Sequence, residues 1–283
     1  MLIDGLFALY VRGPSHPMKV RVVRWMGRTM LPELGVVADV GEGLRLRLHP
    51  RDWIEYLLLQ GLPYEPLTLE FIASNIVAGD GVVLAGTNFG LHSAVAARAV
   101  GTSGLAIGVE PQPAAVLKTW MNLELNGLAP SARLVHAALG DREALVPMAW
   151  SDPDNAGTAS LTAAGAGFVV PMLRLDSITP LLGSRRFRLL LLDVEGYETK
   201  ALAGLNPSAA PEIAVVEVEP TLLARAGACA TDVVASLTRA GYSLFDLRGR
   251  PDPDLADLPE HNLVATRTAT GVRWATGVRA SVG

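Results

Sequence analysis

The sequence predicts an α/β fold in which a mostly parallel sheet carries helices on both faces, with a smaller N-terminal elaboration. The chain has 283 residues, half of them hydrophobic, which is enough for a sizeable core. From residue 79 onward, short and nearly continuous apolar runs alternate with helical patterns, which is typical of parallel strands buried on both faces. Glycine turns follow these runs, as in "VVLAGTNFG" (82–90), where a strand leads into a helix.

Residues 1–78 are expected to form helices and a β-hairpin that pack as a cap on the core. The hairpin is predicted at 36–50, because "LRLRL" alternates with period two beside a glycine-flanked turn. A helix follows in "RDWIEYLLLQG", where Asp52 is the N-cap and Glu55 completes a capping box. A second helix is predicted in "EPLTLEFIASNIVAG", with Pro66 in its first turn.

Residues 79–267 are expected to form the main domain, and residues 268–283 a loose C-terminal tail. Buried strands are predicted in "GVVLAG", "GLAIGVE", "ARLVHAAL", "FRLLLLDVEG" and "EIAVVEVEP", with a short strand in "FVVPMLRLDSI". "YSLFDL" and "HNLVAT" are predicted to close the sheet as an antiparallel pair. The stretch "SDPDNAGTASLTAAGAG" (151–167) is too long for a plain connection, so we expect a functional loop there.

Composition argues against several classes of partner. The formal charge is −4 and no dense Lys/Arg tract appears, so a nucleic-acid partner is not expected. No apolar stretch approaches the roughly 20 residues of a membrane helix, and the N-terminus lacks the basic start of a signal peptide. Cys229 is the only cysteine, which excludes an internal disulfide and fits a cytoplasmic protein. We expect its thiol to be buried and inert.

The glycine turn lacks residues that nucleotide-binding loops use to hold phosphate groups. A dinucleotide fingerprint needs glycine where Asn88 stands between Gly86 and Gly90, and no lysine follows Gly90 as a P-loop requires. The turn therefore suits a nucleoside ligand without phosphates. Glu110 lies twenty residues beyond Gly90, at what we expect to be an exposed end of the second strand, where a carboxylate can accept hydrogen bonds from both ribose hydroxyls. That acid serves NAD and S-adenosylmethionine equally well.

Several motifs together resemble the FkbM-type S-adenosylmethionine-dependent methyltransferases. They are "GTNFG", "GVEPQPAAVLKTWMNLELNG", "HAALGD", "LDSI", "LLLLDVEGYETKALAGL" and "VVEVEP", in the family's order. The upstream "QGLPYEPLTLEFI" also resembles the family's lead-in to its first strand, so the resemblance spans about residues 44–220. It implies a Rossmann-like class I methyltransferase with a seven-stranded sheet whose last strand is antiparallel. It also implies methyl transfer, usually to oxygen and often on natural products or sugars.

The resemblance assigns cofactor-binding roles by position. The residues so assigned are Gly86, Thr87, Asn88 and Gly90 for the methionine part, Glu110 with Pro111 for the ribose, Ala138 and Leu139 for the adenine, and Tyr64 and Glu65 as a cover from the N-terminal side. One position departs from the family pattern, since Leu84 stands where an acid that helps hold the methionine end is typical. Glu65, Asp80 or Asp193 are candidates to replace it; weaker cofactor binding or a catalytically silent relative remain alternatives.

The candidate bases are Asp193, Glu195, Glu217, Glu219 and His92. Asp193 is the first choice because it ends the fourth strand, where the transferring methyl should point; the alternatives are a helix cap for Asp193 and a structural role for His92. Asp193, Glu217 and Glu219 form an alternative set of oxygen ligands for a divalent metal such as Mg²⁺.

The leading functional hypothesis is O-methylation of a hydroxyl on a small natural product or sugar. The loop at 151–167 is expected to act as the acceptor lid, with Asn155 and Ser160 as polar contacts. The alternatives are a silent S-adenosylmethionine-binding relative and a nicotinamide-dependent oxidoreductase, which the missing G-x-G-x-x-G disfavours. The oligomeric state stays open, and a homodimer is compatible with the sequence.

Overall fold

The computed structural model describes residues 35–150, 159–160 and 167–277, together with residues 7, 10–14, 16–29 and 31. Within these residues the chain forms a main sheet of seven strands in the order β12-β13-β11-β10-β3-β4-β5. In chain order these strands are β3 (Gly81–Ala85), β4 (Leu105–Glu110), β5 (Ala132–His136), β10 (Phe187–Leu192), β11 (Ile213–Glu217), β12 (Ser243–Asp246) and β13 (Asn262–Thr266). β13 runs antiparallel to β11 and β12, and the other neighbours are parallel, which confirms the predicted class I fold.

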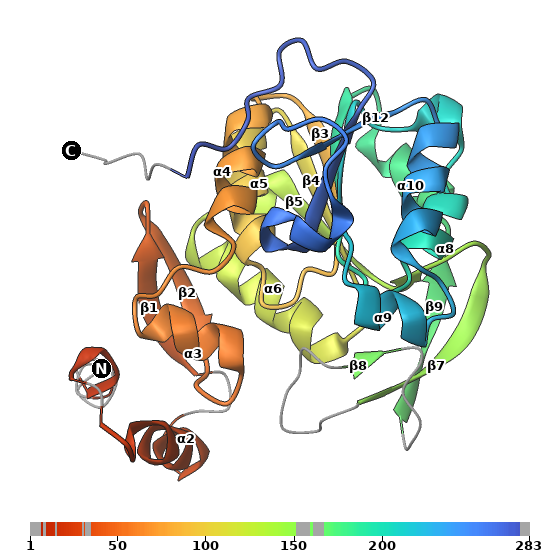
Figure 1. Ribbon diagram of the computed structural model, residues 1–283. Coiled ribbons are helices and arrows are strands. Elements are labelled where there is room, and N and C mark those ends of the chain that lie inside the picture. Colours follow the sequence, from red (N-terminus) through yellow and green to blue (C-terminus); the bar gives the residue numbers. More distant parts are fainter. Residues whose placement is uncertain are drawn as a thin grey trace.

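Both faces of the main sheet are buried under helices (Figure 1). Along β3, Val82 and Leu84 face one hydrophobic core, and Val83 and Ala85 face the other. This period-two alternation, with every residue apolar, is what a doubly covered parallel strand requires. The first core is covered by α4 (Pro66–Asn75), α5 (Leu91–Val100) and α6 (Pro113–Leu125), and the second by α7 (Leu175–Ile178), α8 (Glu198–Ala203) and α10 (Ala230–Arg239).

The N-terminal region packs as helices and a hairpin beside α6. Its elements are α2 (Lys19–Thr29), β1 (Val36–Gly41), β2 (Leu44–Leu48) and α3 (Trp53–Leu59). Asp52 caps α3 through a bond from the Glu55 N–H, as predicted. The capping box is wrong, however, because the Glu55 carboxylate accepts from the His49 N–H and pairs with Lys118 of α6. That ion pair ties the hairpin region to the core.

A second, smaller sheet was only partly predicted. In the described residues this side sheet has the order β6-β9-β7-β8, with β6 (Ala138–Leu139), β7 (Ala144–Trp150), β8 (Ala159–Ser160) and β9 (Gly167–Leu173). β9 was predicted, and the residues of β6 were predicted as the end of the strand "ARLVHAAL", which the structure divides into β5 and β6; β7 and β8 were not predicted. Pro147 explains why β7 was not predicted, because proline rarely occupies a paired strand. β7 pairs antiparallel with β9, and β6 joins the side sheet directly after β5.

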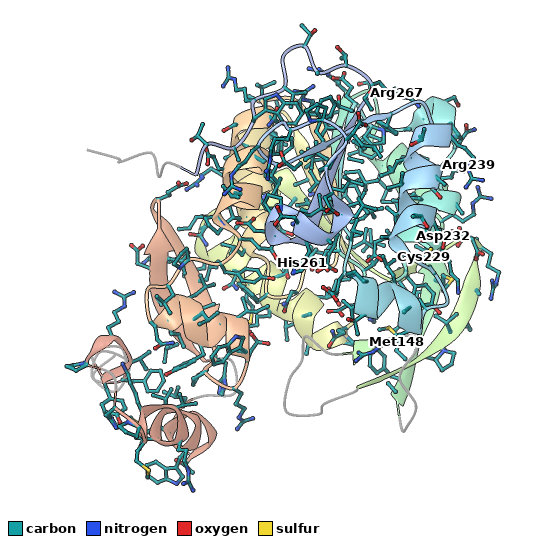
Figure 2. All side chains as sticks on the ribbon, in the orientation of Figure 1. Met148, Cys229, Asp232, Arg239, His261 and Arg267 are labelled. Atoms are coloured by element: carbon teal, nitrogen blue, oxygen red, sulfur yellow. The ribbon has the colours of Figure 1, made fainter. Side chains whose placement is uncertain are left out.

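The C-terminal segment and the cysteine both depart from expectation. Residues 268–277 are not loose: Trp274 stacks on Phe71 and Phe245, and Ala275 is buried. Residues 278–283 lie outside the described residues. Cys229 is exposed rather than buried, because it is the N-cap of α10, where its backbone N–H and its thiol both bond Asp232 (Figure 2).

Another short helix, α9 (Pro220–Arg225), also went unpredicted. Glu219 caps it and Pro220 occupies its first position, so the local signal was present. In the described part of the chain no helix is both long and apolar enough to cross a bilayer.

Candidate functional site

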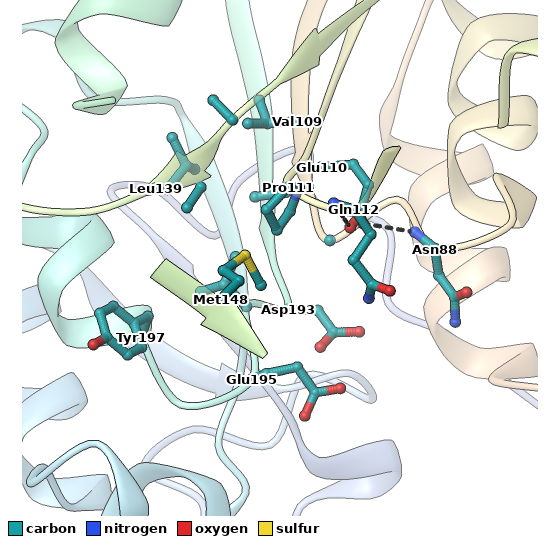
Figure 3. A pocket seen from close by; sticks show the side chains of 15 residues that line it. Asn88, Val109, Glu110, Pro111, Gln112, Leu139, Met148, Asp193, Glu195 and Tyr197 are labelled. Atoms are coloured by element: carbon teal, nitrogen blue, oxygen red, sulfur yellow. Dashed lines mark hydrogen bonds between the residues drawn. The ribbon is translucent and has the colours of Figure 1, made fainter. Parts of the chain in front are cut away.

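A pocket opens at the carboxyl ends of the parallel strands, where ligands of open α/β sheets bind (Figure 3). It holds about 690 Å³ of space, its open mouth included. Eight predicted site residues line it: Gly86, Asn88, Glu110, Pro111, Ala138, Leu139, Asp193 and Glu195. The lining residues that sequence reasoning missed are Ala85, Val109, Gln112, Ala137, Met148, Val194 and Tyr197.

Glu110 holds the central position in the pocket wall. Its two carboxylate oxygens accept hydrogen bonds from the backbone N–H groups of Asn88 (3.1 Å) and Gln112 (2.9 Å), drawn as dashed lines in Figure 3. The side chain was expected on an exposed strand end, but it is only 4% exposed. Burial raises its pKa to about 7, and the two backbone bonds oppose that rise.

The glycine turn is anchored from behind by α6. The Thr119 hydroxyl donates to the Asn88 carbonyl at 2.9 Å, and Asn122 Nδ2 donates to the Phe89 carbonyl at 2.7 Å. A Cβ at Gly90 would lie 3.0 Å from Thr119, so the turn sits directly on the helix. The buried Thr87 side chain meets Thr119 instead of the pocket. Thr87 and Gly90 therefore shape the turn from outside the pocket lining.

The Leu84 side chain packs in the hydrophobic core. Its side chain is 1% exposed and lies in the core under α4 and α5, while the next residue, Ala85, lines the pocket. Among the proposed replacements for the missing acid, Asp80 lies at the wrong end of β3, where its carboxylate caps the Val77 N–H at 3.0 Å. Glu65 and Asp193 remain at the pocket end.

Asp193 and Glu217 form a partly buried carboxyl pair where β10 and β11 end. Burial raises both pKa values, and the Glu217 carboxyl donates a hydrogen bond to Asp193. Two neighbouring carboxyl groups disfavour double ionisation, which adds to the effect of burial in raising the pKa of Glu217. Glu195, which follows Asp193 and lines the pocket, has its pKa raised to about 7 by burial and by the Asp193 charge.

Tyr64, Glu65 and His92 form a second polar cluster beside Asp193. His92 Nε2 lies 3.1 Å from Glu65 Oε2, and the Tyr64 hydroxyl bonds the same carboxylate. Burial alone would lower the pKa of His92, but the hydrogen bond and negative charge of Glu65 hold it above its ordinary value. Burial likewise opposes ionisation of Glu65, and His92 outweighs it to lower the Glu65 pKa. The described geometry therefore favours an imidazolium–carboxylate pair.

The proposed metal ligands are not brought together as a set. β11 ends at Glu217, so Glu219 lies beyond the strand and the two acids do not alternate along it as expected. Glu219 instead caps α9 through the Thr221 N–H at 3.1 Å. In the part of the chain that the structure describes, no group of three or more His, Cys, Asp or Glu side chains is arranged to hold a metal ion.

The two proposed acceptor contacts are only partly described. Asn155 lies outside the described residues. Ser160 lies in β8, where its backbone pairs with Ala149 of β7. The neighbouring Met148 lines the pocket, so β7 connects this segment to the pocket wall.

The buried acids predict that stability falls as pH rises. Glu110 and Glu195 have pKa values raised to about 7, whereas the unfolded chain releases these protons near its ordinary carboxyl pKa, about 4. The folded state binds more protons between these limits, so its stability is lost across that window. Burial lowers the pKa of His49 to about 4, so this group makes stability rise with pH. It is a single group against the two raised carboxyls.

We therefore expect a melting temperature several degrees lower at pH 8 than at pH 5, on the order of 5 °C. Calorimetric scans at constant ionic strength measure it. The double variant Glu110→Gln/Glu195→Gln should flatten the slope, because neither amide titrates. A melting temperature that rises from pH 5 to pH 8 would contradict the assignment.

Comparison with known proteins agrees with this geometry. Residues 84–244, more than half of the chain, match the family described as the methyltransferase FkbM domain. No curated protein matches the chain significantly. Among solved structures, a SAM-dependent O-methyltransferase from Thermotoga maritima is 18% identical over 73% of this chain and 66% of its own, just under two thirds, with a TM-score of 0.42.

Two further structures are similar at comparable levels. A TehB-like SAM-dependent methyltransferase from Corynebacterium glutamicum is 14% identical over 75% of this chain and 92% of its own, with a TM-score of 0.42. A SAM-dependent methyltransferase from Aquifex aeolicus is 11% identical over 67% and 82%, with a TM-score of 0.38. These values are low, and the assignment rests on the match over residues 84–244. The chain belongs to the FkbM methyltransferase family.

Proposed function

We propose that the protein methylates a hydroxyl group of a small natural product or sugar, with Asp193 as the base. The observation that carries the proposal is the position of Asp193. It lies in the pocket wall at the end of β10, beside the Glu217 carboxyl at the end of β11. A base at this place is suited to take the proton that an alcohol loses as its oxygen is methylated.

The residues of the pocket fit S-adenosylmethionine, which supplies an electrophilic methyl group on a sulfonium. Glu110 presents free lone pairs for the ribose hydroxyls, and Ala138, Leu139 and Met148 offer an apolar wall for the adenine. Gly86 and Asn88 border the end nearer Asp193. The carboxylate of Glu65 would stand in for the acid that Leu84 replaces, since it would lie near the positively charged end of the cofactor, and Asp193 is then left to act as the base.

Each acid on this wall has a separate proposed task. Asp193 receives the acceptor proton, and Glu217 holds Asp193 through its own proton. Glu195 contributes negative charge at the pocket edge. A divalent metal at this place would have Asp193 and Glu217 as its carboxylate ligands, since Glu219 caps α9. Asn155 and Ser160 remain proposed acceptor contacts.

Calorimetric titration and an acceptor screen test the proposal together. We expect micromolar binding of S-adenosylmethionine and of S-adenosylhomocysteine, and no comparable binding of NAD or NADP, because the turn lacks the glycine that a diphosphate needs. The screen measures S-adenosylhomocysteine formation with sugars, polyols and hydroxylated aromatics, with and without Mg²⁺, against matched amines. Turnover of amines alone would contradict O-methylation. Binding without turnover on any acceptor would favour the silent relative.

A further inference from the structure

The N-terminus of α4 is capped by a side chain almost two hundred residues away. Glu260, just before β13, accepts hydrogen bonds from the Leu67 N–H (2.9 Å), the Thr68 N–H (2.8 Å) and the Thr68 hydroxyl (2.7 Å). Asn262 also donates to the Thr68 hydroxyl oxygen at 3.0 Å. Pro66 has no N–H, so these bonds satisfy the free donors of the first turn.

Glu65 is the N-cap residue of α4, but its side chain makes no bond to the first turn of the helix. Its carboxylate turns instead toward the site, where Oε2 lies 3.1 Å from His92 Nε2 and the Tyr64 hydroxyl bonds it. A single carboxylate cannot cap α4 and pair with His92 at once. The cap from Glu260 therefore leaves Glu65 free for the site.

The backbone at both ends of this contact is held in an unfavourable conformation. Glu65 (φ 43°), Glu260 (φ 54°) and His261 (φ 55°) all occupy the left-handed region, which residues with a Cβ seldom adopt. The loop is fixed on its other side by the Val218 N–H, which bonds the His261 carbonyl at 2.7 Å; Figure 2 labels His261. Such strain persists where the surroundings over-determine it, and it concentrates at functional sites.

We propose that Glu260 is a positioning residue of the methyl-transfer site: by capping α4 in place of Glu65, it frees Glu65 to pair with His92 beside Asp193. This inference rests on the proposed role of that wall. The charged groups that face His92 are Glu65 before α4, Asp193 after β10 and Glu260 before β13. Glu260 therefore acts on His92 through Glu65 and also through its own charge, and the experiment must separate the two.

A double-mutant cycle read by NMR titration of the His92 imidazole separates them. The proteins are the wild type, Glu260→Ala, Glu65→Gln and the double variant, with the His92 signal assigned by its loss in His92→Gln. We expect Glu260→Ala to lower the His92 pKa by about one unit in the wild-type background, because Glu65 leaves the ring, and by much less in the Glu65→Gln background. Equal shifts in both backgrounds would overturn the proposal, since only the charge of Glu260 would then act.

Glu70 provides a matched control on the same helix. Its carboxylate accepts from the Thr276 N–H (3.0 Å), the Thr276 hydroxyl (2.8 Å) and the Gly277 N–H (3.1 Å), away from the site. Glu70→Ala should lower the melting temperature but leave the His92 titration unchanged; an equal shift would mean that general loosening of α4 explains the result. If Glu260→Ala does not fold, Glu260→Gln replaces it, retaining one acceptor oxygen and giving a smaller shift that is again coupled to Glu65.

The titration needs neither cofactor nor acceptor. A coupled shift in a protein that methylates no hydroxyl would preserve the positioning role of Glu260 and overturn the proposed reaction. Hydroxyl methylation without a coupled shift would support the proposed reaction and overturn the positioning role of Glu260.

Discussion

Glu110→Ala is expected to weaken S-adenosylmethionine binding by about tenfold to a hundredfold, the range for losing hydrogen bonds to a charged group. The carboxylate is buried in the pocket wall, and the N–H groups of Asn88 and Gln112 hold both of its oxygens in place. Its removal leaves those two donors unpaired and takes away the acceptor for the ribose diol. Calorimetric titration measures the affinity, and circular dichroism follows the fold, which should survive.

A ribose analogue makes this result specific. The wild-type protein should bind 2′-deoxy-S-adenosylhomocysteine less tightly than S-adenosylhomocysteine, and Glu110→Ala should lose most of that discrimination, because the missing hydroxyl and the missing carboxylate are partners. Glu55→Ala is the control, since Glu55 is also a buried carboxylate that accepts a backbone N–H, from His49, but lies outside the pocket lining. It should reduce stability and leave affinity alone. Unchanged binding by Glu110→Ala would remove Glu110 from the site.

The main sheet could be predicted because its signals are local. Each buried strand is a continuous apolar run, and a glycine or an acid marks the end of most of them, so "GVVLAG" and "FRLLLLDVEG" needed no tertiary information. The rim residues Gly86, Glu110 and Asp193 followed directly, since parallel strands place their carboxyl ends at one edge.

What could not be predicted depends on contacts between distant segments. Met148 lines the pocket from β7, a strand that was not predicted because Pro147 interrupts its sequence pattern. Glu55 leaves its capping box because Lys118 and the His49 N–H lie within its reach. The cap on α4 comes from Glu260, and no pattern around residue 260 points to a helix that begins at Pro66. Each of these side chains could form several different hydrogen bonds, and contacts with distant segments determine which one forms.

The burial of Glu110 shows the same limit in the site itself. The sequence predicts an exposed Glu110 at the end of β4, but the turn at Asn88 and the residue before α6, Gln112, cover its side chain. That cover changes the chemistry, because burial raises the pKa of the Glu110 carboxyl to about 7.

Asp193→Asn is expected to lower the rate of methyl transfer by about 10²- to 10⁴-fold, the usual worth of a positioned general base. The amide keeps the size of the side chain but cannot take the acceptor proton. The affinity for S-adenosylhomocysteine, which carries no sulfonium charge, should change by only a few-fold, so the loss should appear in turnover. Single-turnover rates with the acceptor found in the screen, together with titrations of S-adenosylhomocysteine, measure the two quantities.

Glu195→Gln is the matched control, because Glu195 shares the pocket wall and a pKa raised by burial but is assigned no proton transfer. Its rate should stay within about tenfold of the wild type, far from the loss expected of a missing base. The pH profile separates the roles further: the wild-type rate should fall as Asp193 takes up its proton on acidification, and that limb should disappear in Asp193→Asn while persisting in Glu195→Gln. Equal losses of rate and affinity in Asp193→Asn would instead assign Asp193 to binding, and the base would have to be sought at His92 or Glu217.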